Sequence, residues 1–258
     1  MLILDANETM GSTYEGDKSR FDCAKQVCLD LLSDLMIRSK THEAAVLVLK
    51  SPITKHHFWE GESKGDDIPF PNILELGGDG IMTGVNRPHP DLLRQIRALQ
   101  VTPSSRDLRG DFCDGLVVAA DALFQRTSGK KYQRKIILIT DAEHEVHVDS
   151  QQLLVVLDSL RAMECRLEVI GWNFESHAEF KQAAIPKPKE EIGATSTTGQ
   201  ENNDDSATEA SGKDMDEDKD EEQEEEDRQL IKSQNEKLLL SLTEKTGGFV
   251  LAAQELQP

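Results

Sequence analysis

KIILITD, residues 135–141, is the stretch of sequence that decides the fold. Four apolar residues run without a break, three of them are isoleucine, and the run ends on Thr140 and Asp141. A short β-branched run closed by polar residues is typical of a strand that is buried on both faces, as in a parallel sheet. In open α/β sheets the functional groups lie in the loops just after the carboxyl ends of such strands. Asp141 stands at one of these ends and is therefore a candidate functional residue.

Helix and strand patterns alternate on both sides of this stretch. Apolar residues recur at helical spacing from Asp17 to Arg38, and the continuous apolar run at residues 44–49 predicts a second buried strand. The other expected strands cover residues 2–4, 72–76, 165–171 and 249–252, and the other expected helices cover residues 91–99, 111–124, 149–163 and the stretch from 228 to the glycine pair at 247–248. This alternation predicts an α/β fold, a doubly wound, mostly parallel six-stranded sheet with helices on both faces.

Acidic residues gather in one segment of the chain. The 258 residues carry a formal net charge of −19, and residues 201–227 alone hold 15 Asp or Glu and 2 Lys, a net of −13 that leaves −6 for the rest. Residues 184–227 offer almost nothing to bury, so they cannot offset the entropy of ordering and are expected to be disordered. We therefore expect residues 1–183 and 228–258 to form one α/β domain, with residues 184–227 as a disordered acidic insertion.

The composition also argues against several classes of protein. No apolar run approaches the roughly 18 residues that a membrane span needs, so no membrane partner is expected. The first ten residues lack the basic and long apolar regions of a signal peptide. The four cysteines lie far apart in apolar surroundings, which predicts reduced, buried thiols.

Oxygen-bearing side chains follow two of the predicted strands. Asp5, Asn7 and Thr9 follow the first strand, and Asp141 with Glu143 follows the strand at residues 135–141. If the two loops lie side by side, these groups could hold Mg²⁺, which prefers oxygen ligands. The alternative is that the two aspartates cap helices or bind the amides of turns at the strand ends.

A basic turn precedes the central strand. Lys130, Lys131, Arg134 and Lys135 could contact the phosphates of a nucleic acid, or they could form a solvated turn. The Gly-Lys pair in this turn lacks the upstream glycine of a phosphate-binding loop and precedes a strand rather than a helix. No nucleotide cofactor is therefore expected.

Four histidines occur in two polar stretches. His144 and His147 stand in HEVH, which lacks the spacing of a zinc-binding HExxH motif, and no supporting ligand is near in the sequence. His56 and His57 are neighbours in a loop rich in proline. Surface positions are expected for all four.

LILDANET, residues 2–9, resembles the first motif of the haloacid dehalogenase phosphatases. In that family the first aspartate is the nucleophile, and a second aspartate two positions later is the general acid. Asn7 stands at the second position here, and a carboxamide cannot donate a proton as a carboxylic acid does. The downstream lysine and acidic pair of the family are not evident, so a phosphatase remains only an alternative.

Longer stretches resemble a different family. DFCDGLVVAADAL at residues 111–123, followed by GKKYQRKIILITD at residues 129–141, is similar to the N-terminal α/β domain of the larger (eighty-kilodalton) subunit of the Ku heterodimer, which has a von Willebrand factor A-like fold. FDCAKQ, which begins at Phe21, fits the same pattern. The resemblance covers residues 2–180 and 228–256 in outline and is most specific over residues 111–141.

This resemblance implies a role in the repair of DNA double-strand breaks by non-homologous end joining, and in telomere maintenance, in the nucleus. It implies three kinds of partner: the smaller Ku subunit, double-stranded DNA ends held by later parts of the subunit, and end-joining factors with short peptide motifs. It also implies a protein-interaction module rather than a catalytic domain, although an ATP-dependent DNA helicase activity is often ascribed to Ku.

The resemblance bears on the metal site as well. Metal-binding A domains use D-x-S-x-S with a threonine and an aspartate from other loops, and Asp5, Asn7, Thr9 and Asp141 match that set only in part. Asn7 is a neutral ligand, so the resemblance implies a degenerate site that holds no metal. A Mg²⁺-dependent, adhesion-type A domain stays open as the alternative reading of the same residues.

Overall fold

The computed structural model describes residues 1–59, 68–77, 84–103, 108–147, 149–174 and 217–253. The chain divides into two units, Met1–Phe174 with Arg228–Pro258, and Glu175–Asp227. The strands are β1 (Leu2–Asp5), β2 (Thr13–Glu15), β3 (Lys18–Ser19), β4 (Val46–Leu49), β5 (Leu74–Leu76), β6 (Arg134–Thr140), β7 (Cys165–Gly171) and β8 (Phe249–Ala252). The helices are η1 (Glu8–Gly11), α1 (Arg20–Arg38), α2 (Pro90–Ala98), α3 (Phe112–Thr127), α4 (Ser150–Ala162) and α6 (Glu217–Thr246).

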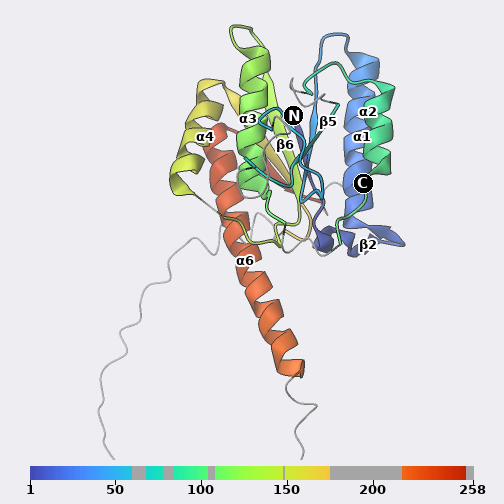
Figure 1. The fold of residues 1–258 in the computed structure, drawn as a ribbon, viewed down its shortest axis with the longest axis vertical. Helices are drawn as coiled ribbons and strands as arrows, with labels where there is room; N and C mark the ends of the chain where they lie inside the picture. Colours follow the sequence, from blue (N-terminus) through green and yellow to red (C-terminus); the bar gives the residue numbers. More distant parts are fainter. Residues whose placement is uncertain (60–67, 78–83, 104–107, 148, 175–216, 254–258) are drawn as a thin grey trace, which may run out of the picture. The chain divides into compact units, whose positions relative to one another are not determined.

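Six strands form one sheet in the order β5-β4-β1-β6-β7-β8. Helices α3 and α4 lie on one side of this sheet, and α1 and α2 lie on the other (Figure 1). All neighbouring strands in the sheet are parallel except β4 and β5, which are antiparallel. The order along the chain reverses between β1 and β6, because strands before β6 add on one side of β1 and later strands add on the other. The predicted six-stranded, doubly wound fold with a central strand at residues 135–141 is confirmed. In such folds ligands bind at the point where the order reverses.

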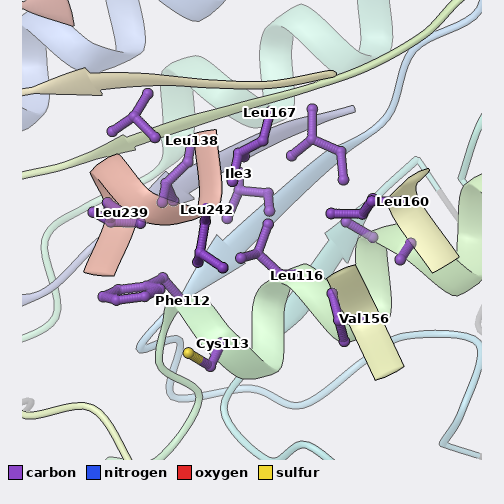
Figure 2. Packing of buried hydrophobic residues seen from close by; sticks show 14 of the residues in the cluster. Ile3, Phe112, Cys113, Leu116, Leu138, Val156, Leu160, Leu167, Leu239 and Leu242 are labelled. Carbon is purple, nitrogen blue, oxygen red and sulfur yellow. The ribbon is translucent and has the colours of Figure 1, made fainter. Parts of the chain in front are cut away.

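Each face of the sheet has its own core. One cluster packs α3, α4 and the C-terminal part of α6 against one face, and Figure 2 labels among its members Leu138 of β6, Leu116 of α3, and Leu239 and Leu242 of α6. The other cluster packs α1 and α2 against the opposite face. Because successive side chains of a strand point to opposite faces, Leu138 belongs to the first cluster and Ile139 to the second. Both side chains are fully buried, whereas Ile137 is only half-buried.

Helix ends follow the signals in the sequence. Ser19 and Asp22 form a capping box at the start of α1, and the Asp111 side chain accepts hydrogen bonds from two amides at the start of α3. At the end of α6, Gly247 adopts a φ of 68°. A Cβ on Gly248 would come within 1.7 Å of the Leu167 carbonyl oxygen. The expected glycine cap is therefore confirmed, and the second glycine is required by the close approach to β7.

The expected boundary of the acidic insertion differs from the structure. Helix α6 begins at Glu217, so its first eleven residues, 217–227, lie inside the segment expected to be disordered. This stretch contains Glu, Lys and Gln without Gly or Pro, and acidic residues near a helix N-terminus interact favourably with the helix dipole. The rest of the predicted insertion, 184–216, lies outside the described residues.

Two further predictions are settled by burial. His56 and His57 are not surface residues, since the side chain of His57 is only 2% exposed and His56 is fully buried. The four cysteines are free thiols, and all except Cys23 are buried. Among the described residues no helix is long and apolar enough to cross a membrane.

Candidate functional site

The two predicted clusters meet at the carboxyl ends of β1 and β6. Asp5 ends β1, Asp141 follows β6, and both are buried. The side-chain nitrogen of Asn7, Nδ2, donates to Asp5 Oδ2 at 3.0 Å and to Asp141 Oδ1 at 3.1 Å, so it bridges the two carboxylates. The Thr140 hydroxyl donates to Asp5 Oδ2 at 2.7 Å. We call this group, with Thr9, the strand-end crevice.

Thr9 and Asn7 also organise the loop after β1. The Thr9 hydroxyl lies 2.5 Å from Asn7 Oδ1 and 2.6 Å from Asp141 Oδ2. Asn7 caps the short helix η1, because its Oδ1 also accepts a hydrogen bond from the Met10 amide at 3.0 Å. All four predicted site residues therefore lie together, as expected. Of the alternative roles, the two aspartates bind turn amides, since Asp5 Oδ1 accepts from the Asn7 backbone amide at 3.2 Å and Asp141 Oδ1 from the Glu143 amide at 3.3 Å, whereas the helix cap is Asn7.

Burial strongly affects the acid chemistry of the strand-end crevice. It raises the pKa of Asp5 to about 6, the neighbouring Asp141 adds to the rise, and the hydrogen bond from Thr140 opposes it. Asp5 therefore takes up a proton at a higher pH than an ordinary aspartate does.

Two cations that the sequence analysis missed close the strand-end crevice. Arg20, the first residue of α1, places Nη1 3.2 Å from Asp141 Oδ2 and 2.9 Å from Glu143 Oε1. Lys232 of α6 donates to the Asp141 carbonyl at 2.9 Å, to the Trp172 carbonyl at 3.2 Å and to Glu143 Oε1 at 3.2 Å. Asn235, one helical turn after Lys232, donates to the Ala142 and His144 carbonyls. The loop after β6 is therefore held by α1 on one side and by α6 on the other.

The residues present do not fit a divalent cation. Both oxygens of Asp141 already accept hydrogen bonds, one from Asn7 and the other from Thr9 and Arg20. Asn7 turns its NH₂ group, which cannot ligate a metal, toward both carboxylates. A cation would have to displace the Arg20 guanidinium and rotate the Asn7 amide. Among the described residues no group of three His, Cys, Asp or Glu is arranged to hold a metal.

The basic turn presents fewer free charges than its sequence suggests. Arg134 turns inward and donates to the carbonyls of Thr127, Lys130 and Met163. Lys135 forms an ion pair of 2.7 Å with Glu168. Lys130 and Lys131 are exposed, and the Lys130 amine donates to the Arg126 carbonyl. Arg134 thus has a structural role. Of the predicted nucleic-acid site, Lys131 is the cation best placed to contact a phosphate.

A protein-family profile for the Ku70/Ku80 N-terminal alpha/beta domain matches residues 1–238 of this chain. The chain belongs to this family. The match spans all the elements that build the strand-end crevice, from Asp5 to Lys232, and it confirms the resemblance drawn from residues 111–141.

Individual relatives agree with the Ku assignment. The X-ray repair cross-complementing protein 5 of Xenopus laevis is 31% identical over 169 residues, which cover 65% of this chain and 21% of that protein. The ATP-dependent DNA helicase II subunit 2 of Neurospora crassa is 26% identical over 196 residues, 74% of this chain and 25% of that protein. The Ku domain described here thus spans about a quarter or less of these two relatives.

Among solved structures, the VWA domain of SpRpn10 is similar, with a TM-score of 0.42 and 14% sequence identity. The similarity covers 72% of this chain and 80% of that one.

Proposed function

We propose that this Ku domain is a protein-interaction module of a DNA-end-binding heterodimer that repairs double-strand breaks by non-homologous end joining. The observation that carries the proposal is the family match over residues 1–238. The proposed partners are the smaller Ku subunit and end-joining factors with short peptide motifs. The proposed site of action is the nucleus, with telomere maintenance as a related role.

The contacts of the strand-end crevice argue against the catalytic alternatives. The carboxylates of Asp5 and Asp141 accept hydrogen bonds from surrounding donors, so a metal or a substrate would first have to displace them; the donors are Asn7, Thr9, Arg20 and Thr140. A haloacid dehalogenase-type phosphatase would need an accessible carboxylate at Asp5, yet this residue is only 6% exposed. The same contacts argue against a Mg²⁺-dependent adhesion domain. For a helicase activity, the sequence offers no phosphate-binding loop.

Tagging the endogenous protein that carries this chain and identifying what co-purifies with it tests the proposal. We expect the smaller Ku subunit in a stoichiometric complex that persists after nuclease digestion, as for two subunits that are held together by protein contacts rather than by shared DNA. Recovery of the tagged protein without that subunit would contradict the proposal.

This chain alone is expected to bind blunt duplex DNA weakly, with a dissociation constant above about 1 μM at roughly 150 mM salt. Strong, salt-dependent DNA binders make about six to ten phosphate contacts. The basic turn offers three exposed lysines, of which Lys135 already pairs with Glu168, and the chain carries a net charge of −19. A fluorescence anisotropy titration measures the affinity.

The variant Lys130→Glu/Lys131→Glu serves as the matched control in that titration. It should remove most of the residual binding if the basic turn is the contact site. Submicromolar binding by the chain alone would instead place a DNA-binding site within this domain and contradict the expectation.

A further inference from the structure

The outer edge of the sheet is covered by a short segment of the loop between β4 and β5. Strand β5 pairs with β4 on one side only. On its other side the Lys55 amide donates to the Ile73 carbonyl at 3.0 Å, and the Glu75 amide donates to the Lys55 carbonyl at 2.7 Å. An uncovered edge strand offers unpaired backbone groups to other chains, so these two bonds protect the edge.

His57 anchors this covering segment two residues after Lys55. Its side chain is only 2% exposed, and Nε2 lies 2.8 Å from Asp121 Oδ2 of α3. Since a carboxylate accepts hydrogen bonds and does not donate them, Nε2 carries a proton. The same oxygen of Asp121 accepts a second hydrogen bond, from the Gln125 amide at 2.6 Å.

The other ring nitrogen of His57 faces a buried carboxylate. Nδ1 lies 3.6 Å from Glu75 Oε2, and the Glu75 side chain is only 1% exposed. The remaining oxygen, Oε1, accepts a hydrogen bond from the Gly84 amide at 2.6 Å. A neutral Nδ1 would turn its lone pair toward an anion that has no hydrogen bond on that oxygen within the described residues. A protonated Nδ1 supplies the counter-charge that a buried carboxylate requires.

The other groups around the ring do not supply this charge. His56 is the adjacent titratable group, and its Nε2 lies 2.9 Å from the Phe70 carbonyl. Burial lowers the pKa of His56, which favours the neutral ring. On the described elements packed against His57, the charged groups are thus Glu75 of β5 and Asp121 of α3, and both are acidic.

We propose that His57, protonated on both ring nitrogens, is a charge clamp that ties β5 to α3 and holds the Lys55 segment over the sheet edge. Loss of its proton as the pH rises leaves Glu75 without a counter-charge and loosens the cover. The clamp is thus a pH-sensitive device at the edge of the sheet. It is independent of the Ku role proposed above.

The pH dependence has a defined sign. Burial lowers the pKa of His57, but the hydrogen bonds and negative charges of Glu75 and Asp121 outweigh burial, so that folding raises the pKa. A group whose pKa is raised by folding contributes stability that is fully present at a pH below the pKa of the unfolded state, which is about 6.5 for histidine. That stability is lost as the pH rises through the pKa of the folded state. The Lys55 segment should therefore be held most firmly in mildly acidic solution.

Histidine NMR titration and amide hydrogen exchange test the clamp. The His57 resonance, identified by its loss in His57→Gln, should titrate with a midpoint above about 6.5. Protection of the Lys55 and Glu75 amides against hydrogen exchange should fall between about pH 6 and pH 9. The fall should reach up to about tenfold for each unit by which folding raises the pKa of His57. Rates are corrected for intrinsic exchange, and the Leu138 amide serves as the reference.

Two variants separate the clamp from general destabilisation. Glu75→Gln removes the buried anion, so the titration midpoint of His57 should drop and protection of the Lys55 amide should lose its pH dependence. This variant keeps the test decisive if His57→Gln does not fold. His42→Gln changes an exposed histidine and should leave both readouts as in the natural protein. A His57 midpoint at or below about 6.5, or one that Glu75→Gln leaves unchanged, would overturn the proposal.

Discussion

Replacing Arg20 with methionine is expected to lower the free energy of unfolding by about 3 kcal/mol. Methionine keeps an aliphatic stem but removes the guanidinium that contacts Asp141 and Glu143. The Asp141 side chain is completely buried, so the variant leaves a buried carboxylate without its cationic partner. Breaking a buried pair from one side costs more than the pair itself contributes, because the remaining charge is neither hydrated nor paired. Urea denaturation measures the loss.

Arg38→Met is the matched control on the same helix. Arg38 pairs with Asp34, but its side chain is 79% exposed, and exposed pairs contribute little. We expect a change of less than about 1 kcal/mol for this variant. Equal effects at the two positions would show that Arg20 is an ordinary surface residue and that the strand-end crevice does not depend on it.

Replacing Ile139 with alanine is expected to cost about 2–5 kcal/mol, because a large buried side chain is removed from the core and a cavity remains. Ile139 lies on the central strand β6 and is completely buried in the cluster that α1 and α2 form with the sheet. The denaturation midpoint in urea should fall while the slope of the transition stays the same.

Ile137→Ala tests the burial argument with the same chemistry two residues earlier. Ile137 points to the same face of the sheet, but it is only half-buried at the outer part of that cluster. Its loss should cost clearly less than that of Ile139. A larger loss of stability for Ile137→Ala than for Ile139→Ala would contradict the burial of the two side chains in this structure.

The parts of the molecule that the sequence predicted well depend on local patterns. The apolar run at 135–141 identified the central strand because a strand with both faces buried needs apolar residues at successive positions. Asp5, Asn7, Thr9 and Asp141 were grouped correctly because parallel strands bring their carboxyl ends to one edge of the sheet. Both inferences need only the periodicity and the order of the strands.

The parts that were missed depend on long-range charge pairing. Arg20 lies at the start of α1, and Lys232 lies on α6, which begins inside the predicted acidic insertion. No local pattern distinguishes the two from surface cations. A physical argument could still have pointed to such partners, because carboxylates that are buried at strand ends require a nearby positive charge. The same reasoning applies to His57, which was assigned to the surface because its loop is polar, although Glu75 and Asp121 hold it inside.

Thermal unfolding in Mg²⁺ and in EDTA at matched ionic strength tests most directly the claim that Arg20, rather than a metal, pairs with Asp141 in the strand-end crevice. A site with a dissociation constant of about 100 μM would stabilise the protein by about 2.7 kcal/mol in roughly 10 mM Mg²⁺. This would raise the midpoint of thermal unfolding by about 5–10 °C. We predict no shift beyond experimental error. A rise of this size, abolished by Asp141→Asn, would show that the crevice is a magnesium site and contradict the account.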